Sequence, residues 1–264
     1  MSATRYSTVL KRRFSFKPVR LIVRVLGTLL LLGLSTPAQA LPTVGQGTQI
    51  LLNGQEISEP WSQWQDSQTG LRIGISDRAL LSTFGIQLLT ANTATQQPIQ
   101  WFTQPNLQSS ALSTRLISSL RYLDVTDLAA QNGWQIKRTA STLQINSPVV
   151  NVLAIRQGQP NWGDRIVIEL DRSTPWQTDS TNQQVILTLN AQATPNLLQQ
   201  IKTVSGKYVQ SISVDPVGNQ TRVRFSIAND IQPRIWSLAK PNRIVVDIRP
   251  DSSIERNILW APGL

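Results

Sequence analysis

The most restrictive feature of the sequence is a series of short alternating segments within residues 149–249. In the clearest of them, at residues 165–172, Ile166, Ile168 and Leu170 alternate with residues that are mostly charged. Successive side chains of a strand point to opposite faces, so this period predicts strands with one buried and one solvated face. Similar segments recur between turn residues at 185–189, 209–214, 221–227 and 243–248. Their spacing predicts an all-β sandwich or barrel.

Positive charge is concentrated at the start of the chain. The 264 residues carry a formal net charge of +10, and seven basic residues but no acidic residue precede position 40. Removing these seven leaves a charge of +3. A chain this weakly basic is not expected to bind nucleic acid, and the excess charge is typical of a targeting segment.

Residues 1–40 predict a secretory signal peptide. An apolar run at 25–34 is followed by the small-x-small sequence Ala-Gln-Ala that ends at Ala40, so cleavage is predicted before Leu41. The run is well short of the roughly 20 residues of a membrane span, which disfavours a permanent anchor. An arginine pair further upstream leaves a twin-arginine route open beside general secretion. The mature protein is predicted to be periplasmic or extracellular and to meet the membrane only during export.

The chain contains no cysteine and no histidine. Disulfides, histidine zinc sites, Ser-His-Asp triads and Cys-His pairs are therefore excluded, and no metal or cofactor site is predicted. Glu169 and Asp171 have the spacing of a glycosidase carboxylate pair, but that spacing is common on solvated strands. Ser237 and Lys240 match the Ser-x-x-Lys of penicillin-binding enzymes without its partner motifs. The chain itself is not predicted to be an enzyme.

Residues 41–148 predict a small α+β domain. A helix that begins at Ser76 or Asp77 is ended by Gly85, which tolerates a left-handed conformation. A second short helix is predicted at residues 124–132, with Asn-Gly at its end. Each helix is followed by strand, turn and strand. An internal duplication would explain this repeated order, although the order also arises by chance in so short a span.

Several segments of this region match a known module. They are Leu52-Asn53-Gly54, Phe84-Gly85, Pro98-Ile99-Gln100-Trp101 and residues 123–129. On these segments, roughly residues 50–145 resemble the copper amine oxidase-like N-terminal domain, an α+β module of exported bacterial proteins. That module carries no copper site despite its name, in agreement with the missing His and Cys.

The strands of the second region, residues 149–251, also resemble a known domain. The matching segments are 152–157, 165–170 with Pro175-Trp176, 185–189, 209–214, 221–227 and 242–248. They resemble the AMIN domain. This resemblance implies a β-sandwich that accompanies cell-wall amidases and other envelope proteins and localises them by contact with peptidoglycan. The expected architecture is thus an α+β module followed by an AMIN-like sandwich, mainly β overall.

Residues 252–264 are apolar at their end and form either a C-terminal extension or the beginning of a junction. In exported bacterial proteins with these two modules, a phosphodiester glycosidase domain of exopolysaccharide synthesis commonly follows. Two interpretations result. The chain is either a non-catalytic envelope protein that binds peptidoglycan or a secreted polysaccharide, or the targeting half or split subunit of such a glycosidase. A cell-wall amidase domain is the other catalytic partner that the resemblance implies.

Five residues are predicted to bind glycan: Arg222, Arg224, Arg243, Trp162 and Trp176. The three arginines face outward by alternation and are expected to share one basic sheet face, where a guanidinium binds a carboxylate with two hydrogen bonds. The two tryptophans lie beside turn residues, where an exposed indole can stack on the apolar face of a sugar. The same patterns also occur on ordinary solvated strands and in cores. The tryptophans of the first module are assigned to its core or its docking surface.

Overall fold

The computed structural model of the protein describes residues 43–250, apart from 105–109, 159, 182, 195–196, 198–205 and 230. All described residues belong to one compact unit, Leu41–Leu264. Strands hold 62% of the described residues and helices 7%, which confirms the prediction of a mainly β protein. No helix in this described part has the length and apolar content that crossing a membrane requires. The predicted signal peptide and residues 252–264 lie outside the described residues.

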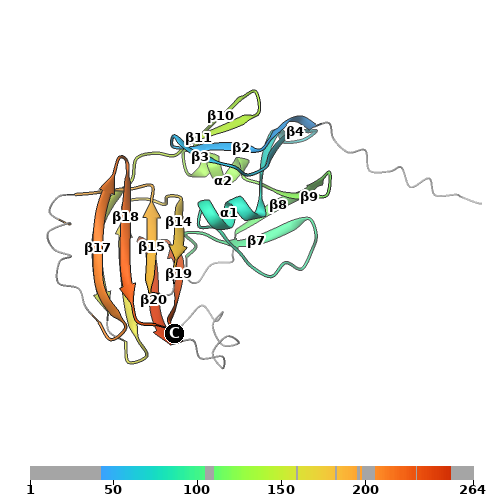
Figure 1. The fold of residues 1–264 in the computed structure, drawn as a ribbon. Coiled ribbons are helices and arrows are strands. Elements are labelled where there is room, and N and C mark those ends of the chain that lie inside the picture. Colours follow the sequence, from blue (N-terminus) through green and yellow to red (C-terminus); the bar gives the residue numbers. More distant parts are fainter. Residues whose placement is uncertain are drawn as a thin grey trace, which may run out of the picture. The chain divides into compact units, whose positions relative to one another are not determined.

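A seven-stranded antiparallel sheet and a four-stranded sheet make up the first module (Figure 1). The larger sheet has the order β1 (Thr43–Gly47), β4 (Trp61–Asp66), β5 (Gly70–Ser76), β9 (Leu120–Asp124), β8 (Ser110–Ile117), β7 (Gln96–Gln100) and β6 (Gln87–Leu88). The smaller sheet has the order β10 (Gln135–Thr139), β11 (Thr142–Asn146), β2 (Gln49–Leu52) and β3 (Gln55–Ile57). In it β2 and β11 pair in parallel, with Ile50 opposite Leu143. The beginning of the module is therefore joined to its last strand.

Both predicted helices of the first module are present. α1 (Asp77–Thr83) begins after Ser76, whose hydroxyl accepts a hydrogen bond from the Ala79 amide at 3.2 Å. Gly85, at φ +66°, follows its end. α2 (Thr126–Gln131) begins two residues later than predicted. Local capping chemistry therefore determines the start of α1, whereas Val125 before α2 makes no side-chain cap hydrogen bond.

The balance of the first module differs from the α+β prediction, because its two helices have only seven and six residues and stand among eleven strands. The strands that were not predicted include β1, β4 and β8. They carry Gly, Gln and Ser where alternating apolar residues would mark a strand, and pairing with neighbouring strands determines them. The two copies of the order helix, strand, turn, strand also end in different sheets. β6 and β7 belong to the larger sheet, and β10 and β11 belong to the smaller one.

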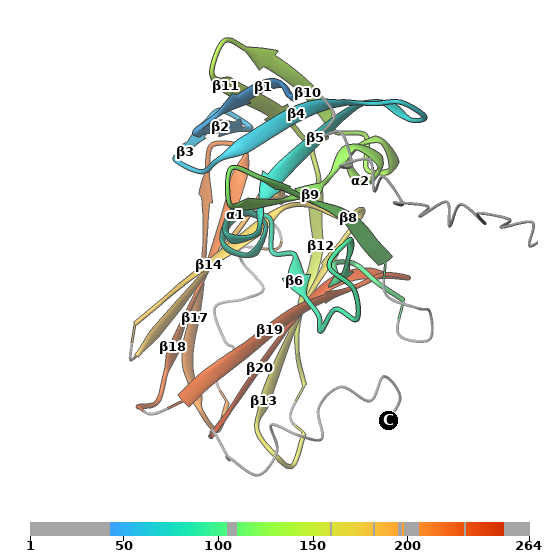
Figure 2. The ribbon, with the colours of Figure 1, turned by 90° about the vertical axis from the view of Figure 1, so that its right-hand side faces the viewer.

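Two further sheets form the predicted sandwich (Figures 1 and 2). The five-stranded sheet has the order β16 (Gln192–Ala193), β12 (Asn151–Gly158), β13 (Asp164–Leu170), β20 (Asn242–Pro250) and β19 (Ile231–Leu238). The four-stranded sheet has the order β14 (Trp176–Ser180), β15 (Gln184–Leu189), β18 (Gln220–Ile227) and β17 (Val209–Val217). Ile166 and Ile168 of one sheet and Val223 and Phe225 of the other are fully buried in one core. Alternation therefore identified the inward side chains correctly.

Two of the places where the first module packs against the sandwich lie at Gly85 and at Phe102. Trp176 lies so close to Gly85 that a Cβ on this glycine would be 2.2 Å from the indole ring. At the second place the Phe102 amide donates a hydrogen bond to the Ser237 hydroxyl at 2.8 Å, and the next residue bridges to the end of β19. An uncovered edge strand invites pairing with other chains, so this contact both joins the modules and covers the end of the β19 edge at Leu238.

The four tryptophans of the first module are buried, each at 6% exposure or less: Trp61, Trp64, Trp101 and Trp134. Trp101 and Trp134 meet edge to face at 5.5 Å, and the Trp101 indole donates a hydrogen bond to the Phe84 carbonyl at 3.0 Å. Aromatic pairs of this kind are favourable beyond the area they bury. The assignment of these tryptophans to the core is confirmed.

Candidate functional site

Strand register creates a row of charged residues on the outer face of the five-stranded sheet. Figure 2 shows the strands that carry this row, β13, β20 and β19. Arg165 on β13 lies opposite Asp247 on β20, and Asp247 lies opposite Arg234 on β19. The Arg165 guanidinium donates two hydrogen bonds to the Asp247 carboxylate, from Nε to Oδ1 at 2.6 Å and from Nη2 to Oδ2 at 2.8 Å. A bidentate pair of this kind fixes the plane of the guanidinium as well as its position.

Two tryptophan rings flank this charged row. The guanidinium carbon of Arg165 lies 5.1 Å from the centre of the Trp162 ring and 5.6 Å from that of Trp236. Arg249 lies 5.6 Å from Trp162, and Arg234 lies 5.4 Å from Trp236. Each guanidinium is attracted to the electron-rich face of an indole. We call this set the Trp–Arg face; its members are Trp162, Arg165, Arg234, Trp236, Asp247 and Arg249.

Gly163 determines where Trp162 lies. A Cβ at Gly163 would be 2.5 Å from the Ile248 carbonyl oxygen and 3.1 Å from the Arg249 Cβ. Contacts that short are excluded, so only glycine lets the turn before β13 approach β20 this closely. The approach brings the Trp162 ring to Arg249 as well as to Arg165.

Three guanidinium groups and one carboxylate make the Trp–Arg face positively charged. The hydrogen bonds to Asp247 raise the pKa of Arg165, whereas burial lowers the pKa of Arg234 and the nearby charge of Arg249 lowers it further. The Asp247 side chain is 9% exposed, but that of Arg165 is 41% exposed. The carboxylate therefore anchors a layer of guanidinium and indole groups that solvent can reach.

This arrangement suits a ligand that carries both sugar rings and carboxylates. An indole face can cover the apolar face of a sugar ring, and a guanidinium can bind a carboxylate with two parallel hydrogen bonds. Because Asp247 and the stacked rings hold the guanidinium groups in place, little side-chain entropy is lost when a ligand binds. The Trp–Arg face is therefore a preorganised candidate for binding such a ligand.

The three predicted arginines do not share one face. Arg222 and Arg224 lie on β18 in the four-stranded sheet, where Arg224 forms an ion pair with Asp215 at 2.8 Å. Arg243 lies on β20 in the five-stranded sheet, opposite Glu169 and four residues before Asp247. The prediction of a single basic face is therefore wrong, because alternation tells which side chains point outward but not to which sheet a strand belongs.

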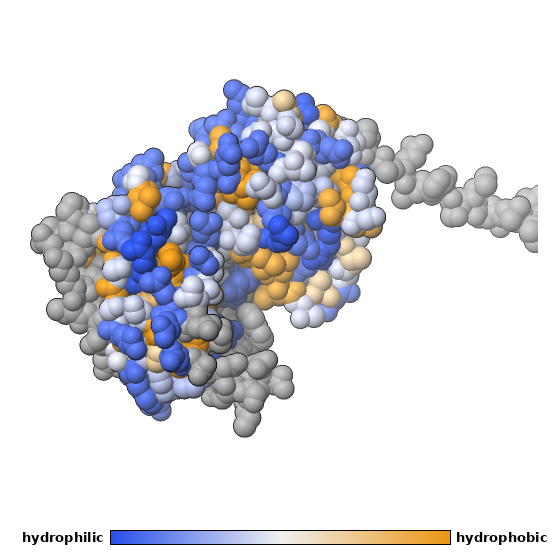
Figure 3. Space-filling model, in the orientation of Figure 1, coloured by the Kyte–Doolittle hydropathy of each residue, from blue (hydrophilic) through white to orange (hydrophobic). Residues whose placement is uncertain are grey.

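The surface over the four-stranded sheet is a mixture of hydrophilic and apolar residues in Figure 3, where this sheet lies at the left as in Figure 1. Thr188 and Asp215 flank Arg222 in the strand register, and Ile186 and Ser213 flank Arg224. These neighbours offer no ring on which a guanidinium could stack. The two predicted arginines of this sheet thus lie in ordinary solvated strand positions.

The two predicted tryptophans also separate. Trp162 is half-buried and belongs to the Trp–Arg face. Trp176 is 5% exposed and packs on Gly85 where the first module meets the sandwich. The Trp176 ring is therefore not accessible to a sugar. The prediction that Trp176 binds glycan is wrong, because the residue packs between the two modules.

The residues of the two weak catalytic patterns make structural contacts. Glu169 forms an ion pair with Arg156 at 3.2 Å, and the Asp171 carboxylate accepts hydrogen bonds from the amide and the side chain of Asn151. Ser237 is 1% exposed, and its hydroxyl accepts a hydrogen bond from the first module. Among the described residues, no group of three or more Asp and Glu is close enough to hold a metal ion.

Of the six members of the Trp–Arg face, only Trp162 was predicted as a site residue, and the missed members include Arg234 and Trp236. Both lie on β19, and Pro233 in the middle of this strand argues against a strand in the sequence. β19 tolerates the proline because it is the last strand of its sheet. The available signal was the spacing of Arg234 and Trp236, two residues apart and therefore on one face of any strand that contains them.

Comparison with known proteins agrees with this architecture. An AMIN domain is found at residues 154–248. AMIN domains are associated with peptidoglycan binding in the cell envelope and occur in exported periplasmic proteins. No curated protein matches the chain.

A solved structure extends the similarity beyond the AMIN domain. The crystal structure of a hypothetical protein from Synechocystis is similar with a TM-score of 0.67 and 28% sequence identity, over 79% of this chain. The AMIN residues alone account for far less than that share, so the similarity includes part of the first module. The aligned part is 35% of the Synechocystis chain, so the present chain spans about a third of that protein's length.

Proposed function

We propose that this protein is an exported, non-catalytic component of the cell envelope that binds peptidoglycan through the Trp–Arg face. The observation that carries this proposal is the packing of three guanidinium groups against two indole rings, with Arg165 fixed by two hydrogen bonds to Asp247. Peptidoglycan offers both chemistries that this layer can bind, because its strands are sugars and its peptides carry carboxylates. The AMIN match at residues 154–248 covers all six residues of the face except Arg249.

Cosedimentation of the purified protein with peptidoglycan sacculi at low salt tests this proposal. The wild-type protein is expected to sediment, and Trp162→Ala is expected to weaken binding about tenfold, as removal of an aromatic anchor does at other interfaces. Arg224→Ala is the matched control on the other sheet and is expected to bind like the wild type. Absence of the wild-type protein from the sacculus pellet would contradict the proposal, and equal losses in the two variants would remove the Trp–Arg face from it.

A second candidate function is the targeting part of a longer enzyme, a phosphodiester glycosidase of exopolysaccharide or cell-wall glycan metabolism. The observation that favours it is the similarity to one third of a longer Synechocystis protein. In this case the described modules would bind glycan while a separate domain or subunit cleaves it. The DNA that follows the coding region decides the matter, because this function requires a glycosidase domain in frame or in an adjacent gene.

A further inference from the structure

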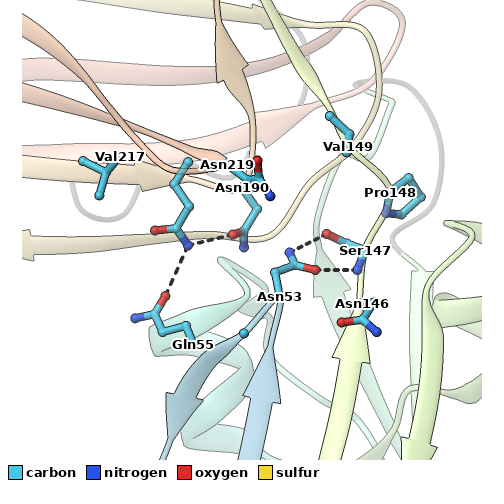
Figure 4. A pocket seen from close by; sticks show the side chains of 11 residues that line it. Asn53, Gln55, Asn146, Ser147, Pro148, Val149, Asn190, Val217 and Asn219 are labelled. Atoms are coloured by element: carbon cyan, nitrogen blue, oxygen red, sulfur yellow. Dashed lines mark hydrogen bonds between the residues drawn. The ribbon is translucent and has the colours of Figure 1, made fainter.

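A concave surface separate from the Trp–Arg face lies where the first module meets the sandwich (Figure 4). It is a hollow of about 460 Å³ at which several turns converge. They are the β2–β3 turn, the connection that contains Ser147 and Pro148, the turn at Asn190 and the β17–β18 turn. Small-molecule sites favour such junctions, and this volume lies within their usual range of roughly 300–1,000 Å³.

Side-chain carboxamides dominate the lining of this hollow. Six of its eleven lining residues are Asn or Gln, and none carries a charge. The six are Asn53, Gln55, Asn146, Asn190, Asn219 and Gln220. Each carboxamide has two N–H donors and one carbonyl acceptor, so the hollow displays both kinds of group in a small space. We call this hollow the amide pocket.

Hydrogen bonds within the amide pocket hold several of these groups in place. The Gln220 amide donates to Asn190 Oδ1 at 2.8 Å and, across the module junction, to Gln55 Oε1 at 3.3 Å. The Asn53 side chain donates to Ser147 Oγ at 2.8 Å and accepts from the Ser147 amide at 2.8 Å. Asn190 and Gln55 thus accept these hydrogen bonds through their side-chain oxygens. Among the described residues neither side-chain NH₂ donates to a protein atom, so both donors are available to a ligand at the hollow.

The lining selects against ions. A charged ligand that entered the amide pocket would lose hydration without meeting an opposite charge, which is costly. A neutral ligand with many hydroxyl or acetamido groups meets donors and acceptors at each of them. Apolar groups also border the hollow, because Pro148 lines it and the side chains of Val149 and Val217 are 61% and 43% exposed. Such groups can cover the C–H face of a sugar ring.

We propose that the amide pocket is a binding site for an uncharged saccharide. The site is separate from the Trp–Arg face and does not depend on the function assigned to that face. Asn190 and Gln55 donate to the sugar from opposite modules, and Gln220 holds both carboxamides in position. A bound sugar therefore also bridges the first module and the sandwich.

Titration calorimetry with two oligosaccharides of the same backbone tests the proposal. The neutral probe is tetra-N-acetylchitotetraose, and the charged probe is its fully deacetylated counterpart. The neutral probe is expected to bind saturably with a dissociation constant at or below about 1 mM. It is expected to bind at least about tenfold more tightly than the charged probe, whose ammonium groups find no carboxylate in the lining. No saturable binding, or equal binding of the two probes, would overturn the proposal.

Isosteric variants locate the bound sugar. Asn190→Asp and Gln55→Glu keep the oxygen that accepts from Gln220 and remove the NH₂ donor, so each is expected to weaken binding about fivefold or more, the usual effect of one lost hydrogen bond. Asn229→Asp is the matched control, because Asn229 Oδ1 accepts from a glutamine amide at 2.8 Å outside the hollow. The control is expected to bind within about twofold of the wild type. Equal effects of all three variants would overturn the proposal.

Trp162→Ala separates this site from the Trp–Arg face. In this background Asn190→Asp is still expected to weaken binding of tetra-N-acetylchitotetraose about fivefold, while sacculus binding is about tenfold weaker than in the wild type. Loss of the oligosaccharide in Trp162→Ala would place the sugar on the Trp–Arg face and overturn the amide pocket. Failure of sacculus binding in the wild type would overturn the proposed function and leave the oligosaccharide result to decide the pocket.

Discussion

The two sheets of the sandwich both expose arginines, but they use them differently. On the five-stranded sheet Arg165 lies between two indole rings and is held by a carboxylate that is almost buried. On the four-stranded sheet Arg224 meets an Asp215 whose side chain is 44% exposed. The comparison teaches that a basic sheet face is not by itself a binding site. Aromatic neighbours and a buried counterion convert mobile positive charge into a fixed surface.

The largest expected difference between the two sheets concerns stability. Asp247→Asn removes the bidentate partner of Arg165 and leaves three guanidiniums together, so we expect it to lower the free energy of unfolding by about 2 kcal/mol. Asp215→Asn removes an exposed partner and is expected to cost about 0.5 kcal/mol or less. Urea denaturation of both variants measures these values. Equal losses would show that the two ion pairs are equivalent.

The second expected effect concerns the contribution of Trp236 to sacculus binding. Sequence patterns did not identify this residue as a site residue. Trp236→Ala is expected to weaken binding about tenfold, because it removes the ring shared by Arg165 and Arg234. Trp236→Phe keeps an aromatic face and is expected to weaken binding about threefold or less. Sacculus cosedimentation gives the affinities, and thermal unfolding shows whether each variant is folded. A folded Trp236→Ala protein with wild-type affinity would exclude this ring from the site.

Salt is expected to have a moderate effect that depends on which sheet is altered. Raising NaCl from 50 to 500 mM shortens the screening length from roughly 14 Å to about 4 Å and should weaken wild-type sacculus binding several-fold. Arg249→Gln should bind more weakly at low salt and show a smaller salt dependence. Arg222→Gln, the matched charge removal on the other sheet, should keep the wild-type salt dependence. Identical behaviour of the two variants would mean that long-range charge alone attracts the ligand.

The smallest expected effect is that of pH near neutrality. The chain has no histidine, and hydrogen bonds to Asp247 raise the pKa of Arg165 above its ordinary value. The Trp–Arg face therefore keeps its charge, and sacculus binding should be constant from about pH 5.5 to 8.5. Below about pH 4 binding should fall as ligand carboxylates become protonated. A transition near pH 6.5 in the cosedimented fraction would contradict this expectation.

Sequence patterns predicted the parts of the fold that local chemistry controls. The Ser76 cap and Gly85 determine the limits of α1, and alternation identified Ile166 and Phe225 as core residues. The same patterns failed for β19, where Pro233 interrupts the expected strand. They also failed for Trp176, because a residue beside a turn can equally well lie in the core or at the surface. Burial of a large side chain depends on what packs against it, and here that is Gly85 from another module.

The sequence by itself determined that the protein is mainly β, which side chains of its strands point inward, and that imidazole and thiol chemistry are unavailable to it. Each of these follows from residue identity or from the two-residue period of a strand. Tertiary structure alone decided that Arg165, Asp247 and Arg234 form one row and that Arg222 and Arg243 lie on different sheets. The reason is that strand order and register depend on contacts between segments far apart in the chain, which no local pattern encodes.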